Sequence, residues 1–200
     1  MAEITAAMVK QLRDATGAGM MECKAALTEA SGRLDEATTI LRKRGLAQAT
    51  KKAGRSTNEG IVAHYIHMGG KIGVLVEVNC ESDFVARTED FQNLAKEIAM
   101  HIAAASPQYV RREDVPADVV GRERDVYKGQ MEGQKKPPAV LDKIVEGKLN
   151  SFYEQVCLLD QPSVRDPKVT IGQLVTQAIA KMGENIAIPR FVRFKLGETA

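Results

Sequence analysis

The chain has 200 residues, enough for one large or two small domains, and its 44% content of hydrophobic residues can fill a real core. Its 28 basic and 26 acidic residues leave a net charge of +2, which argues against a surface dominated by nucleic-acid or membrane binding. Five phenylalanines, four tyrosines and no tryptophan are too few for rows of base-stacking side chains.

The cysteines and the apolar runs bear on the cellular compartment. Cys23, Cys80 and Cys157 are odd in number and widely spaced, which argues against a disulfide framework or a zinc site and favours a reducing environment. The chain begins without the basic-then-apolar layout of a signal peptide, and no apolar run approaches the roughly 18 residues of a membrane span. We therefore expect a soluble, cytoplasmic protein without a membrane partner.

The N-terminal part of the chain predicts three short helices. The first begins near Thr5, the second near Met20, and the third ends at Gly45, a natural residue for the position after a helix. Residues 46–59 are polar and basic and predict a linker, whose basic side chains either contact RNA or are simply solvated.

The second helix starts with Met20 and Met21 directly after a glycine-flanked turn. Adjacent helical positions point about 100° apart, so one small core can hardly take both side chains, and we expect one of them at the surface. Methionine is adaptable, which suits a contact site. The alternative is one core methionine and one that is exposed incidentally.

The middle of the chain predicts a β-hairpin. Strand patterns cover residues 60–68 and 71–79, and the second strand alternates apolar residues with a period of two. Gly69 and Gly70 lie between them, and a type I′ turn needs positive φ at both of its central residues.

A strand-to-helix turn follows this hairpin. Ser82 and Asp83 are good N-cap residues for a helix that continues through Ile102, and Phe84 comes immediately after them. An acid beside a bulky aromatic at such a turn can be a wedge directed at a partner. The alternative is a capped helix whose first aromatic packs back onto its own fold. Further along the helix, His101 lies four residues after Glu97, which predicts an exposed pair and not a catalytic base.

Residues 117–156 predict an antiparallel helical hairpin. Two charged helices with narrow apolar seams are separated by a break at 133–138. Because each seam is satisfied by its partner helix, such a hairpin is expected to project from the body as an interaction arm.

The chain then returns to the body. Thr170 and Gln173 form a capping-box pattern at the start of a helix that ends at Gly183. The segment from Ala187 to Leu196 alternates as a third strand. Together these elements predict an α+β fold with a small antiparallel sheet.

The sequence contains no catalytic motif of a known kind. It has no Gly-x-Ser-x-Gly elbow, no His-Glu-x-x-His and no dinucleotide-binding fingerprint. We therefore expect an interaction protein that is not an enzyme and that needs neither metal nor cofactor. The alternatives are a ribosome- or RNA-associated protein and an enzyme whose site is assembled from distant residues.

Three segments carry a resemblance to a known family. They are residues 4–27, beginning Ile-Thr-Ala-Ala-Met-Val, residues 77–87, Glu-Val-Asn-Cys-Glu-Ser-Asp-Phe-Val-Ala-Arg, and residues 182–186, Met-Gly-Glu-Asn-Ile. In this order they resemble the bacterial elongation factor Ts family over essentially the whole chain.

The resemblance implies a division into two domains. Residues 1–54 would form a ubiquitin-associated-like three-helix domain that docks on elongation factor Tu, with contact candidates Leu12, Met20 and Met21. Residues 55–200 would form the core and dimerisation domain, and the hairpin at about 117–156 would match the coiled-coil arm of the family.

The resemblance also implies a guanine-nucleotide exchange factor that promotes GDP release by displacing Mg²⁺. The segment that the family assigns to this step is present here as Ser82, Asp83, Phe84 and Val85. Ser82 stands where the family usually has threonine and keeps the hydroxyl, and Arg87 stands where lysine is frequent and keeps the charge.

One departure concerns the core. Long family members carry two related core halves, whereas this chain has one complement of strands and helices. It therefore resembles the short form, in which a homodimer supplies the missing half and assembles two-to-two with Tu. The strand at Ala187–Leu196 is a plausible place for the dimer contacts. No direct nucleic-acid partner is expected.

Overall fold

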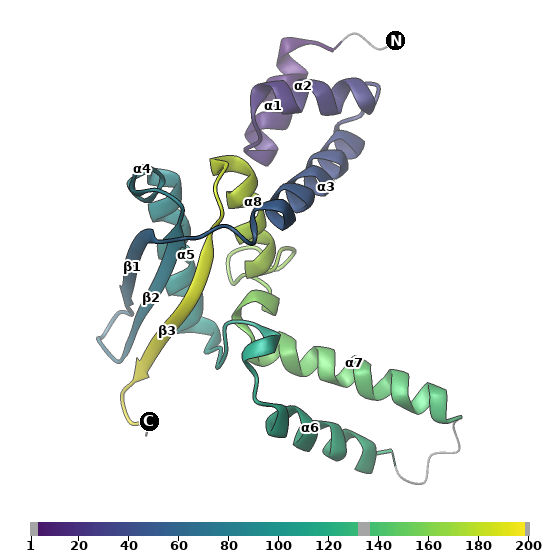
Figure 1. The fold of residues 1–200 in the computed structure, drawn as a ribbon, viewed down its shortest axis with the longest axis vertical. Coiled ribbons are helices and arrows are strands. Elements are labelled where there is room, and N and C mark those ends of the chain that lie inside the picture. The colour runs from purple at the N-terminus through teal and green to yellow at the C-terminus, as the bar shows by residue number, and fades with distance from the viewer. Residues whose placement is uncertain (1–3, 132–136, 199–200) are drawn as a thin grey trace. The chain divides into compact units, whose positions relative to one another are not determined.

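The structure is a computed structural model that describes residues 4–131 and 137–198 (Figure 1). Within those residues the fold is α+β, with a three-stranded antiparallel sheet in the order β1-β2-β3, as the sequence predicts. The α-helices are α1 (Ala6–Thr16), α2 (Met20–Glu29), α3 (Leu34–Lys52), α4 (Asp83–Ala86), α5 (Glu89–Ala105), α6 (Ala117–Gly129), α7 (Pro138–Val156) and α8 (Ile171–Met182). The strands are β1 (Glu59–Ile66), β2 (Ile72–Cys80) and β3 (Ala187–Lys195), and two 3₁₀ turns are η1 (Arg112–Asp114) and η2 (Leu158–Asp160).

The chain divides into two compact units, each built from three separate segments. The first comprises Met1–Ile61, Val78–Ala95 and Leu174–Ala187. The second comprises Val62–Glu77, Lys96–Gln173 and Ile188–Ala200. The first unit therefore holds α1, α2 and α3 together with α4, and most of the sheet lies in the second.

The three N-terminal helices form as their sequence predicts. The Thr5 hydroxyl accepts a hydrogen bond from the Met8 amide as the N-cap of α1, and Gly17 ends that helix with a left-handed φ of 68°. The helices enclose a small apolar core, which consists of Val9, Leu12, Cys23, Ala26, Leu27, Ala30, Ala37 and Leu41.

Helix α3 is longer than predicted, because it passes through Gly45 and ends at Lys52. A Cβ atom on Gly45 would lie 3.3 Å from the Cβ of Ala180 in α8, so the glycine allows two helices to approach closely and does not end one. Ala49, one turn further on, is also buried. The linker predicted at 46–59 is therefore helical over its first half.

The β1–β2 hairpin is confirmed, but its turn differs from the predicted type. The His67 amide donates to the Ile72 carbonyl, and the Gly70 amide donates to the His67 carbonyl. The central residues of that turn are consequently Met68 and Gly69, not the two glycines. Gly69 and Gly70 both have positive φ, so the loop still requires both of them.

His101 is buried, which contradicts the exposed pair predicted with Glu97. The imidazole is 0% exposed, and its Nε2 lies 2.9 Å from Oε1 of Gln161. Its Nδ1 accepts a hydrogen bond from the Val164 amide. Glu97 instead pairs with Arg165. The helical spacing was right, but the loop after α7 covers the face that carries His101.

Helices α6 and α7 run antiparallel and pack along their apolar seams (Figure 1). Val120 and Tyr127 from α6 contact the cluster formed by Met131, Val145 and Leu149. The polar break predicted at 133–138 lies mostly outside the described residues.

The predicted capping box at the start of α8 is present. The Thr170 amide donates to the Gln173 side chain, and the Gln173 amide donates to the Thr170 hydroxyl. Two of the four unpaired amides at the helix start are thereby satisfied.

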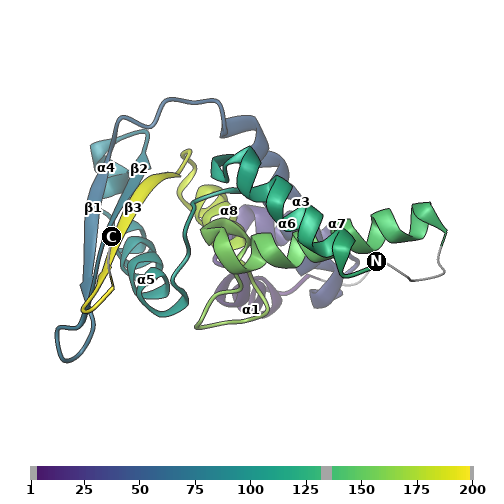
Figure 2. The same ribbon diagram turned by 90° about the horizontal axis from the view of Figure 1, so that it is seen from below.

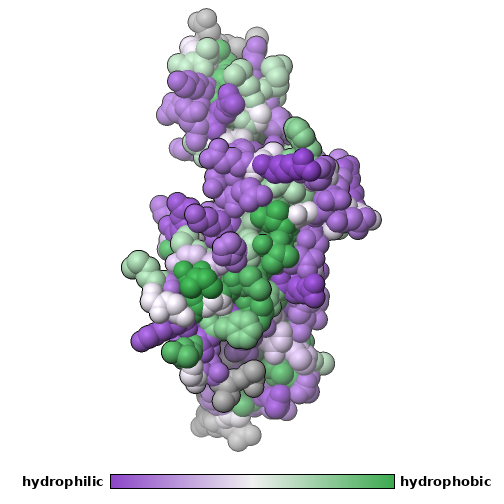
Figure 3. Space-filling view, turned by 90° about the vertical axis from the view of Figure 1, so that its left-hand side faces the viewer, coloured by the Kyte–Doolittle hydropathy of each residue, from purple (hydrophilic) through white to green (hydrophobic). Residues whose placement is uncertain are grey.

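The sheet has one covered face and one open face. Figure 2 shows α5 on one side of the strands, and several apolar side chains that point to the other side are exposed. Side chains alternate along β3, so that Phe191 and Arg193 point inward and Val192 and Phe194 point outward. Figure 3 shows apolar side chains gathered on the open face. These exposed side chains are Val62, Ile66, Leu75, Val192, Phe194 and Leu196.

Candidate partner-binding site

The strand-to-helix turn after β2 begins α4 with a serine cap. The Ser82 hydroxyl accepts a hydrogen bond from the Val85 amide at 3.3 Å, and the Ser82 backbone is extended, as an N-cap requires. Val85 and Ala86 face inward and are buried. Because these two residues pack down, Asp83 and Phe84 are left on the outer side of the turn.

The end of α4 is also secured by side chains. The Thr88 hydroxyl donates to the Val85 carbonyl at 2.7 Å, and the Gln92 side chain donates to the Ala86 carbonyl at 2.7 Å. Thr88 also accepts a hydrogen bond from the Phe91 amide, which makes it the cap of α5. The single helix predicted from Ser82 is thus two helices, because a second cap interrupts it.

Phe84 is exposed at 78% although it stands on a turn whose two ends are both fixed. The structure therefore does not pack this ring back onto its own fold, which was the alternative left open by the sequence. Beside it, the Asp83 carboxylate pairs with the Arg87 guanidinium at 2.8 Å, and both side chains are exposed. An ion pair of this kind costs little to open.

The three candidate contacts of the N-terminal helices lie in different environments. Met20 is 58% exposed and Met21 is 76% exposed, so neither serves the core of the three helices. Leu12, by contrast, is 1% exposed and belongs to that core. Its side chain offers no surface to a partner in this structure, because α2 and α3 cover it.

Met20 and Phe84 border the same hollow in the first unit. The hollow has a volume of about 560 Å³ and lies between the α1–α2 turn, α4 and the end of α8. An ion pair between Lys181 and Asp90, 2.7 Å apart, lies at its wall. The structure thus brings together two candidates that are 64 positions apart in the sequence. The remaining lining residues are Arg13, Gly17, Ala18, Gly19, Val85, Thr88 and Met182.

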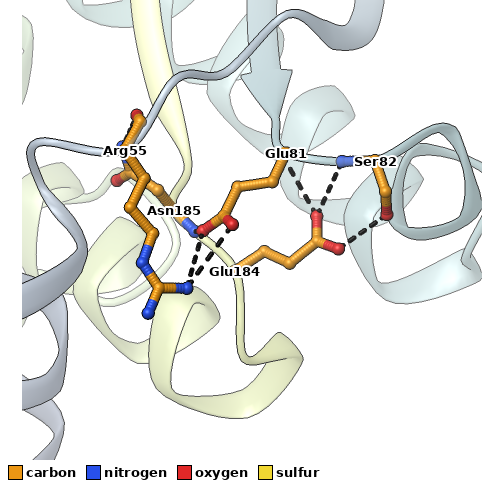
Figure 4. Close-up of polar contacts among 5 residues, drawn as sticks. All are labelled: Arg55, Glu81, Ser82, Glu184 and Asn185. Carbon is orange, nitrogen blue, oxygen red and sulfur yellow. Dashed lines mark hydrogen bonds and ion pairs between the residues drawn. The ribbon is translucent and has the colours of Figure 1, made fainter.

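A cluster of polar side chains holds the turn from below (Figure 4). One Glu184 oxygen accepts from the Glu81 and Ser82 amides at 3.1 and 3.0 Å, and the other accepts from the Ser82 hydroxyl at 2.6 Å. The Asn185 amide donates to Glu81 at 2.6 Å, and its side chain donates to the Arg55 carbonyl at 2.9 Å. The Arg55 guanidinium lies 3.5 Å from the Glu81 carboxylate. We call these five residues the Glu184 clamp.

The sequence reasoning assigned no role to Glu184 or Asn185, although their segment was one of the three that carried the resemblance. Their partners lie more than 100 positions earlier in the chain, so no local spacing predicts the contact. The one local signal is their place directly after Gly183, which ends α8 with a positive φ of 77°.

The buried Cys80 thiol lies beside the turn. Burial, with a contribution from the Glu184 carboxylate, raises the pKa of the Cys80 thiol. The thiol therefore stays protonated at neutral pH and donates to the Ser82 carbonyl. The described residues contain no group of three or more histidine, cysteine, aspartate or glutamate side chains placed to hold a metal ion.

Comparison with known proteins decides the family. The family described as Elongation factor TS matches residues 1–198. The chain belongs to the elongation factor Ts family. It is 60% identical to the elongation factor Ts of Solibacter usitatus over 99% of this chain and 93% of that protein.

Other members of the elongation factor Ts family are similarly close. The protein of Anaeromyxobacter sp. strain Fw109-5 is 63% identical over 99% of this chain and 90% of its own length. That of Fervidobacterium nodosum is 58% identical over 98% of this chain and all of its own length. As a member of this family, the chain is an elongation factor of protein biosynthesis. Within the described residues, no helix combines the length and the apolar composition that a bilayer crossing requires.

Proposed function

We propose that this chain is the guanine-nucleotide exchange factor of elongation factor Tu and acts by promoting GDP release. The observation that carries the proposal is Phe84, a large apolar ring that is 78% exposed on a turn fixed at both ends. Membership of the elongation factor Ts family supports the identity of the partner. The reaction makes and breaks no bond in the factor, which is therefore not an enzyme and needs no cofactor.

The thermodynamics of nucleotide exchange determines how much binding energy the contact with Tu must supply. If an exchange protein weakens GDP binding to its partner by a given ratio, GDP weakens the binding of the exchange protein to that partner by the same ratio. Weakening GDP binding 10⁴-fold requires about 5.5 kcal/mol of differential contact energy. Burying one aromatic side chain supplies about 2–3 kcal/mol of it. The rest must come from further contacts.

Phe84 acts as the wedge in this mechanism. Its ring enters an apolar gap of the partner and displaces the elements that hold Mg²⁺ near the nucleotide. Loss of the ion leaves the phosphate charges unbalanced and loosens GDP. Asp83 opens its exposed pair with Arg87 and accepts a hydrogen bond from the displaced segment, while Ser82 and Val85 hold the turn.

Met20 and Met21 supply the docking contacts. Both side chains are exposed at the start of α2, and Met20 shares the hollow with Phe84. Flexible thioether side chains adapt to an apolar partner surface. Leu12 supports these contacts indirectly, because it belongs to the core that holds the three helices together.

The test is the release of a fluorescent GDP from elongation factor Tu in a stopped-flow instrument, with and without catalytic amounts of the factor. We expect acceleration by orders of magnitude, and slow release with Phe84→Ala despite retained complex formation. Leu46→Ala is the control, since Leu46 is an exposed apolar residue on α3. Equal loss of binding and exchange in Phe84→Ala would make the ring an ordinary anchor and contradict the wedge.

We also propose that the open face of the sheet joins two copies of the chain, which then assemble two-to-two with Tu in the cytoplasm. Five exposed apolar side chains on three adjacent strands, with Leu196 directly after β3, exceed what isolated surface residues explain. Phe194, on the edge strand β3, is 66% exposed and central to this proposal.

The oligomeric state tests the second proposal. Light scattering after size exclusion should give twice the mass of the chain for the wild type and a monomer for Phe194→Glu. Val126→Glu, at an exposed apolar position on α6, should stay dimeric. A wild-type monomer at micromolar concentration would contradict the dimer.

A further inference from the structure

The Glu184 clamp fixes the backbone of the turn that carries the exposed Phe84 ring. The Phe84 ring can displace elements of the partner only if the backbone that carries it does not move instead. α4 has four residues, too short to be stable by its own hydrogen bonds. Its start must therefore be held by something outside the helix.

Glu184 is the group in contact with that start. Its carboxylate accepts three hydrogen bonds, two from the consecutive amides of Glu81 and Ser82 and one from the Ser82 hydroxyl. The hydroxyl donates its only proton to Glu184, so its lone pairs are directed to the Val85 amide, which it caps. The bond to Glu184 thus orients the cap as well as anchoring the backbone.

The other half of the clamp keeps Glu184 in place. Asn185 binds the Glu81 side chain through its backbone amide and the Arg55 carbonyl through its side-chain amide. Two neighbouring residues after α8 therefore grip the end of β2 and the segment before β1 at the same time (Figure 4). Hydrogen bonds to a charged acceptor are stronger than those between neutral groups. Such bonds suit a turn that must keep its conformation while Phe84 contacts the partner.

We propose that Glu184 is a positioning residue for nucleotide exchange, which aims and stiffens Phe84 by fixing the Ser82 cap. This inference rests on the proposed exchange function. Removing the carboxylate leaves Phe84 exposed but on a turn that yields, so the ring is accommodated by the partner without displacing its elements. Docking through Met20 and Met21 is unaffected.

A double-mutant cycle on GDP release tests the coupling. Glu184→Ala should slow release at saturating factor about tenfold, because it removes charge-assisted hydrogen bonds. In a Phe84→Ala background the same substitution should change the rate less than about twofold, since the group through which it acts is gone. Glu184→Gln should recover part of the rate, because its carbonyl oxygen still accepts from the two amides whereas its NH₂ group cannot accept from the Ser82 hydroxyl.

A direct readout separates this inference from the proposed function. Hydrogen exchange of the Val85 amide should be faster in Glu184→Ala than in the wild type, whatever Phe84 does. Glu97→Ala, which removes a carboxylate that pairs with Arg165 and not with the turn, is the control for both measurements. Should Glu184→Ala not fold, Ser82→Ala removes the same cap from the other side and takes its place.

Each outcome has a distinct meaning. Unchanged Val85 protection, or equal slowing by Glu184→Ala with and without Phe84, overturns the positioning role. Normal exchange by Phe84→Ala overturns the wedge in the proposed function. Faster Val85 exchange together with that result would leave a clamp that holds the turn but has no part in exchange, which also overturns the inference.

Discussion

Gly60 lies at a point where backbone conformation and packing both demand glycine. Its φ is 146°, and a Cβ atom there would lie 2.3 Å from the Val78 carbonyl oxygen and 2.7 Å from the Asn79 Cα. Both neighbours are backbone atoms of β2, so neither can turn aside as a flexible side chain can. The sequence shows a glycine in a strand at this position but does not show what it approaches.

We predict that Gly60→Ala lowers the free energy of unfolding by about 2 kcal/mol or more, through strain at this φ and displacement of β2. Urea denaturation of the purified chain measures it. Gly54→Ala is the matched control, because no atom lies within 4 Å of its Cβ position, and it should stay within about 0.5 kcal/mol of the wild type. Equal stability of the two variants would contradict the close approach.

The N-terminal candidates allow a prediction that separates contact from support. Met21→Ala should weaken binding to Tu about tenfold and leave the melting temperature unchanged, because its side chain is 76% exposed. Leu12→Ala should instead cost about 2–5 kcal/mol of stability through a cavity in the core of the three helices. Titration calorimetry and thermal denaturation measure the two effects. A stable Leu12→Ala variant with weak binding would restore Leu12 as a direct contact.

Among the elements, α8 has one end that is determined by local sequence and another that is determined by tertiary contacts. Its capping box forms between residues three positions apart, and the sequence predicts it correctly. Its last turn and the residues that follow are occupied by long-range partners, Asp90 for Lys181 and Ser82 for Glu184. Contacts between residues close in sequence thus fix the start of this helix, and contacts with distant residues fix its end.

We predict that Thr170→Ala destabilises the protein by about 1 kcal/mol, because the Gln173 amide loses its acceptor. Chemical denaturation measures the change. Thr50→Ala is the control, since that hydroxyl only bonds back to the Leu46 carbonyl on the exposed side of α3. An equal cost for both would mean that the cap contributes nothing beyond the loss of a threonine.

At the scale of the whole molecule, the buried His101 makes stability depend on pH. Burial lowers the pKa of its imidazole. The chain of hydrogen bonds explains why the neutral ring is preferred. The Val164 amide donates to Nδ1, so the proton lies on Nε2 and is donated to Gln161, whose own amide group donates to the Gln155 carbonyl. A second proton at Nδ1 would face a donor.

The sign of the effect follows from this lowered pKa. Below about pH 6.5 the unfolded chain binds a proton at His101 that the folded chain refuses, so stability falls as the pH falls. Between pH 7.5 and 5.5 we expect His101 to remove up to about 1.4 kcal/mol of stability. Urea denaturation at both values measures this, and His101→Gln should lose that part of the pH dependence even though it lowers stability at both. An unchanged slope in the variant would contradict the prediction.

Much of the fold follows from the sequence because its signals are local. The Thr5 cap, the Gly17 end of α1, the alternation along β2 and the α8 capping box all involve residues within four positions of one another. For the candidate site, the sequence identified the exposed Phe84 turn and the methionine pair. It misplaced His101, because no helical spacing shows which loop will cover a face, and it ended α3 too early, because a glycine at a close approach looks the same as a glycine after a helix end.

The sequence by itself determined most of the secondary structure, the α+β class and, through long matching segments, the family. Hydrogen bonds and apolar periodicity within one element are enough for that, because they span few residues. Only the tertiary structure decided that Leu12 is core and Met21 is surface, that Met20 and Phe84 share one hollow, and that Glu184 holds the Ser82 cap. These contacts join residues up to about 100 positions apart, and such pairs form only when packing brings their elements together.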